Sequence, residues 1–186
     1  RILQLQHENL KLIFPLPAPA NNSSSSGNLI DSKNIELVTK LIAEKSKDSF
    51  FKIKVPGSNR ILINSIRDLR KSIYLKSDNL GRRIILIFDA HLLSMGQGEA
   101  ANALLKLLEE PPKKTSFILV TDQINLVLST IISRCQSISF PRLDDEFIFE
   151  WFSSKISNID EVNFFVGLSD GNIHLSLIHI SEPTRR

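Results

Sequence analysis

The sequence predicts an α/β domain built on a parallel sheet flanked by helices, and three apolar segments carry this prediction. Ile84–Phe88 is an unbroken apolar run, which indicates a strand buried on both faces of a parallel sheet. Ser116–Thr121 is predicted as a second buried strand and Gln136–Phe140 as a third. Asp89 follows the first strand directly, so it falls at the carboxyl edge of the sheet, where ligands usually bind.

A helix is predicted between the first two of these strands. Its apolar residues recur at helical spacing: Ala101, Leu104, Leu105 and Leu108. Pro111 and Pro112 prevent its continuation beyond Glu110. Glu109 and Glu110 lie in the last turn, where the helix dipole disfavours negative charge by about 0.3 kcal/mol or more each. This broken rule suggests a partner for those carboxylates.

The other elements follow from capping residues and periodicity. Pro15–Asn34 contains three prolines and a run of serines, so it is predicted as a disordered or surface insertion within the domain (about residues 15–34). The remaining predicted elements are a strand around Leu10–Phe14, a helix capped by Asp31 or Asn34 and ending near Lys47, a short strand at Phe51–Val55, a helix capped by Asn64 and ending near Leu75, a helix opened by Asp144 and Asp145, and a segment around Val162–Leu168.

Composition sets broad bounds on the function. With 186 residues, 42% of them hydrophobic, the chain can bury the core of one domain and part of another. A net charge of +3 permits nucleic acid as a partner without arguing for it. The single cysteine excludes an internal disulfide, and no Cys/His spacing suits zinc, so we predict no metal site. A reducing cytoplasm is the simplest location, and no apolar run is long enough to suggest a membrane.

Four motifs in a fixed order carry a family resemblance: Asp89–His91 (DAH), Glu99–Pro112 (EAANALLKLLEEPP), Phe117–Thr121 (FILVT) and Ile131–Cys135 (IISRC). With them, the chain resembles a bacterial DNA polymerase III clamp-loader subunit of the AAA+ superfamily. The delta prime type is the closer match and gamma/tau the second. The resemblance runs from about residue 7 to about residue 174. It implies a partial AAA+ P-loop-type domain over residues 1–142 and the start of a small helical lid domain over residues 143–174.

Several features lead us to expect a fragment that is truncated at its N-terminus. The chain starts at Arg1, and the Walker A pattern is absent because none of its seven glycines precedes a lysine. We therefore expect any phosphate-binding loop upstream. The resemblance of His7–Leu10 to the family also implies a possible zinc module before residue 1. At the other end, residues 175–186 resemble a translated sequencing adapter and are treated as an artefact.

The resemblance also implies a degenerate ATP site. Active members of the family end the corresponding strand with D-E-x-H, whereas this chain has Phe88–His91 there. Phe88 replaces the metal-binding aspartate and cannot coordinate Mg²⁺. Asp89 stands where the catalytic glutamate would be, as a degenerate Walker B residue, although capping the following turn is the interpretation we favour. Thr121 matches the sensor 1 position, and His91 is expected to be a supporting or surface residue.

Arg134 is the strongest functional candidate. In the family, the matching arginine of the S-R-C motif enters the ATP site of a neighbouring subunit and stabilises charge on the γ-phosphate. Ser133 and Cys135 are the structural members of this motif, and Cys135 is expected to pack rather than react. ATP and Mg²⁺ would then lie at the interface with that neighbour, with no cofactor held within this fragment.

These expectations describe a DNA replication protein, a subunit of the DNA-directed DNA polymerase III holoenzyme that hydrolyses ATP poorly or not at all. The resemblance implies a hetero-oligomeric ring with gamma/tau and delta subunits, which reaches the sliding clamp and primed DNA through the complex. Two alternatives stay open: a gamma/tau-like ATPase with an intact upstream loop, and a stand-alone AAA+ adaptor.

Overall fold

The structure is a computed structural model, and it describes residues 5, 7–17, 32–48, 51–75 and 81–173. Most of the predicted insertion, the Asp31 cap and the adapter-like residues 175–186 lie outside these ranges. Contacts divide the chain into two compact units, Arg1–Ser137 and Ile138–Arg186. Each unit is described by itself below.

The first unit is built on a sheet of three parallel strands in the order β1-β2-β3. The strands are β1 (Leu10–Ile13), β2 (Arg83–Ile87) and β3 (Thr115–Leu119). In their register Ile84 lies between Leu10 and Ser116. The predicted α/β class with a parallel sheet is therefore confirmed. The prediction that β2 is buried on both faces is wrong in part, because Ile85 and Ile87 are fully buried whereas Ile84 is exposed.

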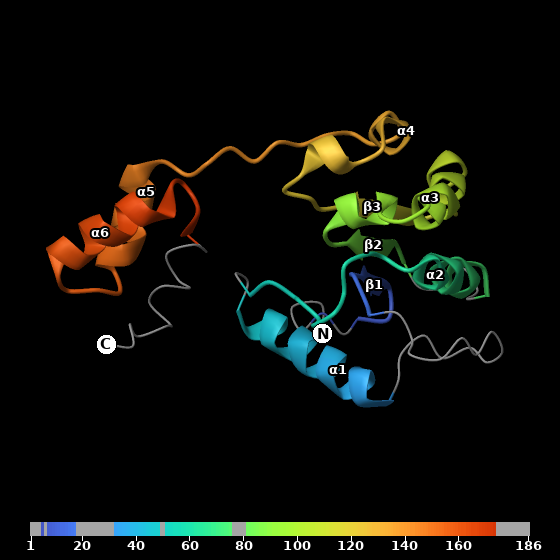
Figure 1. Cartoon of the computed structure of the whole chain (residues 1–186), viewed down its shortest axis with the longest axis horizontal. Coiled ribbons are helices and arrows are strands. Elements are labelled where there is room, and N and C mark those ends of the chain that lie inside the picture. Colours follow the sequence, from blue (N-terminus) through green and yellow to red (C-terminus); the bar gives the residue numbers. More distant parts are fainter. Residues whose placement is uncertain (1–4, 6, 18–31, 49–50, 76–80, 174–186) are drawn as a thin grey trace. The chain divides into compact units, whose positions relative to one another are not determined.

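Helices flank this sheet on both sides (Figure 1). The helical elements are α1 (Ser32–Lys47), α2 (Ile63–Leu75), the 3-10 turn η1 (Ala90–Ser94), α3 (Glu99–Glu109), the 3-10 turn η2 (Ile124–Leu126) and α4 (Ser129–Ile132). The predicted Asn64 cap is wrong, because α2 begins at Ile63 and Asn64 lies within its first turn.

Two apolar cores lie on opposite faces of the sheet. The first core packs β2 against α2, α3 and α4, with Ile87, Leu104 and Ile131 among its buried residues. The second core packs the other face against α1 and includes Phe14 and Phe88. Because side chains alternate along a strand, Ile87 and Phe88 enter different cores. Leu16 is also buried in the second core, so the start of the predicted insertion is part of the packed domain.

The helix α3 forms as predicted, but its buried face differs in part from the predicted one. Its fully buried residues are Ala100, Ala101, Leu104 and Leu107. Leu105 and Leu108, which were predicted in the stripe, are half-buried against the first core. The helix ends at Glu109, immediately before Glu110 and the two prolines.

Two predicted strands do not form. Phe51–Val55 lies outside the sheet, and its alternation reflects burial of Ile53 and Val55 in the second core rather than strand pairing. Gln136–Phe140 is also not a strand, and Ile138 and Phe140 are 72% and 88% exposed. A strand needs a hydrogen-bonding neighbour, and in the described ranges β3 pairs only with β2. Its free edge also leaves Ile118 exposed, so β3 is not the fully buried strand that was predicted.

The second unit contains two helices, α5 (Asp145–Ser153) and α6 (Ile159–Ser169). Ile148, Phe152 and Val162 from these helices form a separate core with Ile173, which follows α6. Both helices fall where the sequence predicted them, and α5 opens at Asp144 and Asp145 as expected. In the described residues, no helix is long and apolar enough to cross a membrane.

Candidate functional site

Asp89 occupies the turn that leaves β2. Its backbone is left-handed, with φ 49° and ψ 48°, a conformation that aspartate tolerates better than most residues. The Asp89 carbonyl accepts a hydrogen bond from Leu92 N at 2.8 Å, which closes the turn. The favoured sequence interpretation was a side-chain cap, and this is wrong: Asp89 stands at the N-cap position of η1, but its side chain makes no capping hydrogen bond.

The Asp89 carboxylate instead pairs with Lys52. The Lys52 Nζ atom lies 3.3 Å from Asp89 Oδ1 and 3.6 Å from Asp122 Oδ2, so one ammonium contacts two carboxylates. Partial burial of Lys52 lowers its pKa, but Asp89 and Asp122 outweigh this effect, and the pKa is raised above the ordinary value of 10.5. Lys52 is therefore a cation at neutral pH, and it offsets part of the negative charge of Asp89 and Asp122 at the end of β2.

Phe88 lies one residue before Asp89 and turns to the opposite face of the sheet. Its ring packs against the second core, whose buried members are Phe14, Leu16, Ile53 and Val55. The residue that replaces the metal-binding carboxylate of the family pattern thus contributes to packing. A carboxylate at this position would face apolar side chains.

His91 and Thr121 interact beside this turn. The His91 ring is buried, and its Nδ1 lies 3.0 Å from Thr121 Oγ1. Thr121 Oγ1 also accepts a hydrogen bond from the backbone N of Gln123 at 3.0 Å. The hydroxyl at the sensor 1 position is thus already engaged within the subunit. The sequence left open whether His91 is a supporting or a surface residue. Its buried ring next to Thr121 favours the supporting role.

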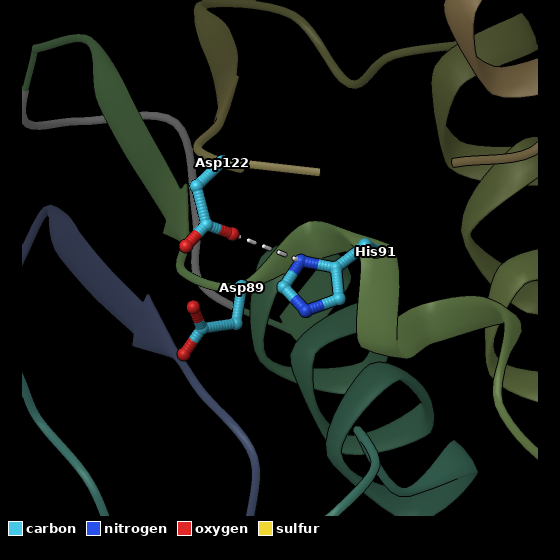
Figure 2. Close-up of side chains that lie close together, drawn as sticks. All are labelled: Asp89, His91 and Asp122. Atoms are coloured by element: carbon cyan, nitrogen blue, oxygen red, sulfur yellow. Dashed lines mark ion pairs between the residues drawn. The ribbon is translucent and has the colours of Figure 1, made fainter. Parts of the chain in front are cut away.

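Asp89, His91 and Asp122 form a small cluster at the carboxyl edge of the sheet (Figure 2). Each offers one ligand atom, and these atoms lie within 4.8 Å of one another. Imidazole and carboxylate groups suit a divalent metal. Lys52 already contacts both carboxylates, however, so a metal would have to displace its ammonium. Sequence reasoning missed Lys52 and Asp122. The available signal was that Asp89 and Asp122 follow neighbouring strands.

Arg134 lies just after α4 and is held at two points. Its Nη2 donates to Glu109 Oε1 at 2.8 Å, and its Nη1 donates to the backbone carbonyl of Thr130 at 2.9 Å. Ser133 Oγ donates to the same Thr130 carbonyl at 3.1 Å. The Arg134 side chain is 35% exposed and that of Glu109 49%, so the guanidinium is accessible from solvent.

Cys135 turns inward beside Arg134. It packs against the first core, and burial raises the pKa of its thiol. A raised pKa leaves less of the nucleophilic thiolate at neutral pH. This contact agrees with a packing role for Cys135. The candidate residues therefore fall into two groups, one around Asp89 and Lys52 and one around Arg134 and Glu109.

Comparison with known proteins supplies the family. The family model described as DNA polymerase III, delta subunit, matches residues 1–144. The DNA polymerase III subunit tau of Bacillus subtilis is 36% identical over 52% of this chain and 16% of its own length. The subunit gamma of Buchnera aphidicola from Acyrthosiphon pisum is 34% identical, covering 53% and 27%. The subunit delta' of Haemophilus influenzae is 31% identical, covering 62% and 34%.

The chain thus spans between 16% and 34% of the length of these relatives. The crystal structure of a DNA polymerase III gamma subunit-related protein from Thermotoga maritima is similar over 87% of this chain and 50% of its own length. The sequence identity is 23% and the TM-score is 0.47. The family match includes the whole parallel sheet and both groups of candidate residues. The chain belongs to the DNA polymerase III delta subunit family of clamp-loader proteins.

Proposed function

We propose that this protein is a delta prime-type clamp-loader subunit that hydrolyses no ATP itself and donates Arg134 to the ATP site of a neighbouring subunit. It acts in the cytoplasm, in a hetero-oligomeric ring with gamma/tau and delta subunits. Through that ring it takes part in loading the sliding clamp onto primed DNA. The observation that carries this proposal is the contrast between Phe88, whose ring is part of an apolar core, and Arg134, whose guanidinium is accessible.

The end of β2 supports the absence of hydrolysis. Phosphoryl transfer needs a carboxylate that holds Mg²⁺ and a group that orients the attacking water. Phe88 offers no ligand atom and packs into the second core. Asp89 remains, but its carboxylate is paired with the Lys52 ammonium. A cationic side chain beside Asp89 opposes metal binding there through charge repulsion and competition for the same oxygen atoms.

The end of α4 supports a role in trans. A guanidinium is planar, always charged and rich in donors, which suits it to bind phosphate oxygens and stabilise the charge of the transition state. Arg134 projects from a short helix whose Ile131 is buried in the first core, so its backbone is anchored. ATP and Mg²⁺ are then cofactors of the interface with the neighbour. A zinc module upstream of residue 1 remains part of the proposal for the whole protein.

The gamma/tau type is the second candidate. One observation favours it: the tau relative is 36% identical, whereas the delta' relatives of Haemophilus influenzae and Yersinia pestis are 31% and 34% identical. A subunit of that type would hydrolyse ATP on its own. ATP turnover by the isolated full-length protein therefore separates the two candidates, because the delta prime type predicts no measurable turnover.

The test of the proposal is ATP turnover by the full-length protein reconstituted with its gamma/tau and delta partners, clamp and primed DNA. Removal of an arginine finger lowers phosphoryl transfer by about 10³-fold or more at the affected site. We expect Arg134→Ala to lower turnover by the ring at least about tenfold, with Arg134→Lys restoring only part of it.

Arg142→Ala is the matched control, because Arg142 also forms an exposed ion pair with a carboxylate, that of Asp170. Turnover should be unchanged in this variant. If Arg134→Ala also leaves turnover unchanged, the role in trans is wrong. Absence of a stable complex with gamma/tau or delta in a pull-down would favour the stand-alone adaptor instead.

A further inference from the structure

Glu109 is the residue that holds the candidate finger. It is the last residue of α3, and its carboxylate contacts the guanidinium of Arg134 with Oε1 2.8 Å from Nη2. A carboxylate at this end of a helix is disfavoured by the helix dipole. A residue that is locally unfavourable and yet sits in a charge-assisted hydrogen bond across two elements indicates a role beyond the stability of its own helix.

The guanidinium is fixed by two different elements. Glu109 from α3 accepts from Nη2, and the carbonyl of Thr130 in α4 accepts from Nη1 at 2.9 Å. The two elements are joined by the first core, where Leu107 and Ile131 are both buried. The two acceptors therefore have a fixed relative position, and together they select one direction for the long Arg134 side chain.

This holding still leaves Arg134 able to bind a phosphate. A guanidinium has five N–H groups, and the contacts to Glu109, Thr130 and the more distant Ser133 Oγ at 3.4 Å engage at most three of them. The ion pair is also open to water, so it is of the weak surface kind. Arg134 can thus meet a γ-phosphate while Glu109 still contacts it, or leave Glu109 with little loss.

We propose that Glu109 is a positioning residue that preorganises Arg134 for the ATP of the neighbouring subunit. This inference rests on the proposed function of Arg134 in trans. Without Glu109, the arginine must be ordered at each encounter with the phosphate, which lowers the rate of the chemical step. The contact of Arg134 with the γ-phosphate stabilises the transition state more than it stabilises bound ATP. Loss of Glu109 therefore lowers kcat and leaves the KM for ATP unchanged.

The test compares Glu109→Gln with Glu110→Gln in the reconstituted ring. Both variants remove one negative charge from the same helix end, so any effect of the dipole is shared. Of these two glutamates, only Glu109 forms an ion pair with Arg134 in the described structure. We expect Glu109→Gln to lower kcat about two- to fivefold with little change in KM, the range set by a surface ion pair. Glu110→Gln should match the unaltered ring. An unchanged or increased kcat in Glu109→Gln overturns the positioning role.

A double variant and a spectroscopic readout separate this inference from the proposed function. If Glu109 acts through Arg134, adding Glu109→Gln to Arg134→Ala causes no further loss of kcat. A further loss overturns the inference even if Arg134 is the finger. The side-chain Nε–H of Arg134, followed by ¹⁵N NMR in the full-length protein, should become more mobile in Glu109→Gln but not in Glu110→Gln. That measurement needs no ATP turnover. Unchanged turnover in Arg134→Ala refutes the proposed function whatever the mobility of Arg134, whereas unchanged Arg134 mobility in Glu109→Gln refutes the positioning role even if Arg134 is the finger.

Discussion

The end of β2 and the end of α4 differ in how their charged side chains are paired and exposed. At the end of β2, one lysine lies against Asp89 and Asp122, and its neighbour Phe88 is packed into a core. At the end of α4, a single carboxylate meets Arg134, and both groups remain open to solvent. The first region pairs its carboxylates with a cation of the same subunit. The second keeps a cation where a partner can reach it.

Under the proposed function, this difference explains how the fold would lose ATP hydrolysis and keep a role in trans. The carboxyl edge of a parallel sheet is the usual place for ligands, and here it is occupied by internal contacts among Lys52, Asp89, His91 and Thr121. Arg134, the proposed finger, is positioned by the turn after a short helix anchored by Ile131 and by the end of α3. Its geometry is therefore independent of whether the β2 end can bind a metal.

The strongest way to break the comparison is to return a carboxylate to the end of β2 with Phe88→Asp. This substitution removes an aromatic ring from the second core and places a charge among apolar side chains such as Phe14 and Val55. We expect the free energy of unfolding to fall by about 3 kcal/mol, with no gain of ATP hydrolysis. Chemical denaturation of the full-length protein measures the change in stability.

Phe88→Leu is the matched control, because it shortens the side chain without adding charge. We expect it to cost about 1 kcal/mol. If Phe88→Asp is no less stable than Phe88→Leu, the packing role of the ring is wrong. Turnover by isolated Phe88→Asp protein would show that the lost carboxylate alone separates this subunit from an active one.

A second variant, Lys52→Met, sharpens the comparison by removing the internal cation. The cluster of Asp89, His91 and Asp122 then keeps its ligand atoms within 4.8 Å of one another without the competing ammonium. We expect Mn²⁺ or Co²⁺ to bind at least about tenfold more tightly than to the unaltered protein, since one unit of positive charge has left the site. Titration calorimetry measures this affinity.

Lys54→Met serves as the control for a lost surface charge, because Lys54 is exposed two residues away. It should leave metal affinity unchanged. Equal metal affinity in Lys52→Met and Lys54→Met would mean that Lys52 does not oppose metal binding by Asp89, His91 and Asp122.

The sequence predicted the finger region better than the β2 end, for a physical reason. The helix between Gly98 and the prolines follows local rules of periodicity and helix breaking, and the dipole rule that Glu109 breaks pointed to a partner. Arg134 was singled out by the motif that carries the family resemblance. Lys52 has no such local signal. It lies in a segment whose alternation suggested a strand, and only the tertiary fold brings it to Asp89.

The two missing strands have the same explanation. An alternating or continuous run of apolar residues indicates a segment that could be buried. It forms a strand only where a neighbouring strand is present to pair with it. Ile53 and Val55 are buried but form no strand hydrogen bonds. Ile138 and Phe140 lie in a segment with strand-like composition and are exposed. Periodicity therefore located the apolar residues correctly more often than it located their hydrogen bonds.

The smallest expected effect concerns the pH dependence of the Lys52 contact. The folded state raises the pKa of Lys52 above 10.5 because Asp89 and Asp122 outweigh the effect of burial. A group with a raised pKa binds its proton more tightly when folded, so its contribution is complete below pH 10.5 and is lost as the pH rises through the folded pKa. Since Lys52 is 53% exposed, solvent screens the pair, and we expect a loss of only about 0.5 kcal/mol. The check is the difference in unfolding free energy between unaltered and Lys52→Met protein from pH 8 to 11.5, because other titrating groups cancel in that difference. A difference that stays constant across this range would show that the ammonium of Lys52 does not stabilise the end of β2.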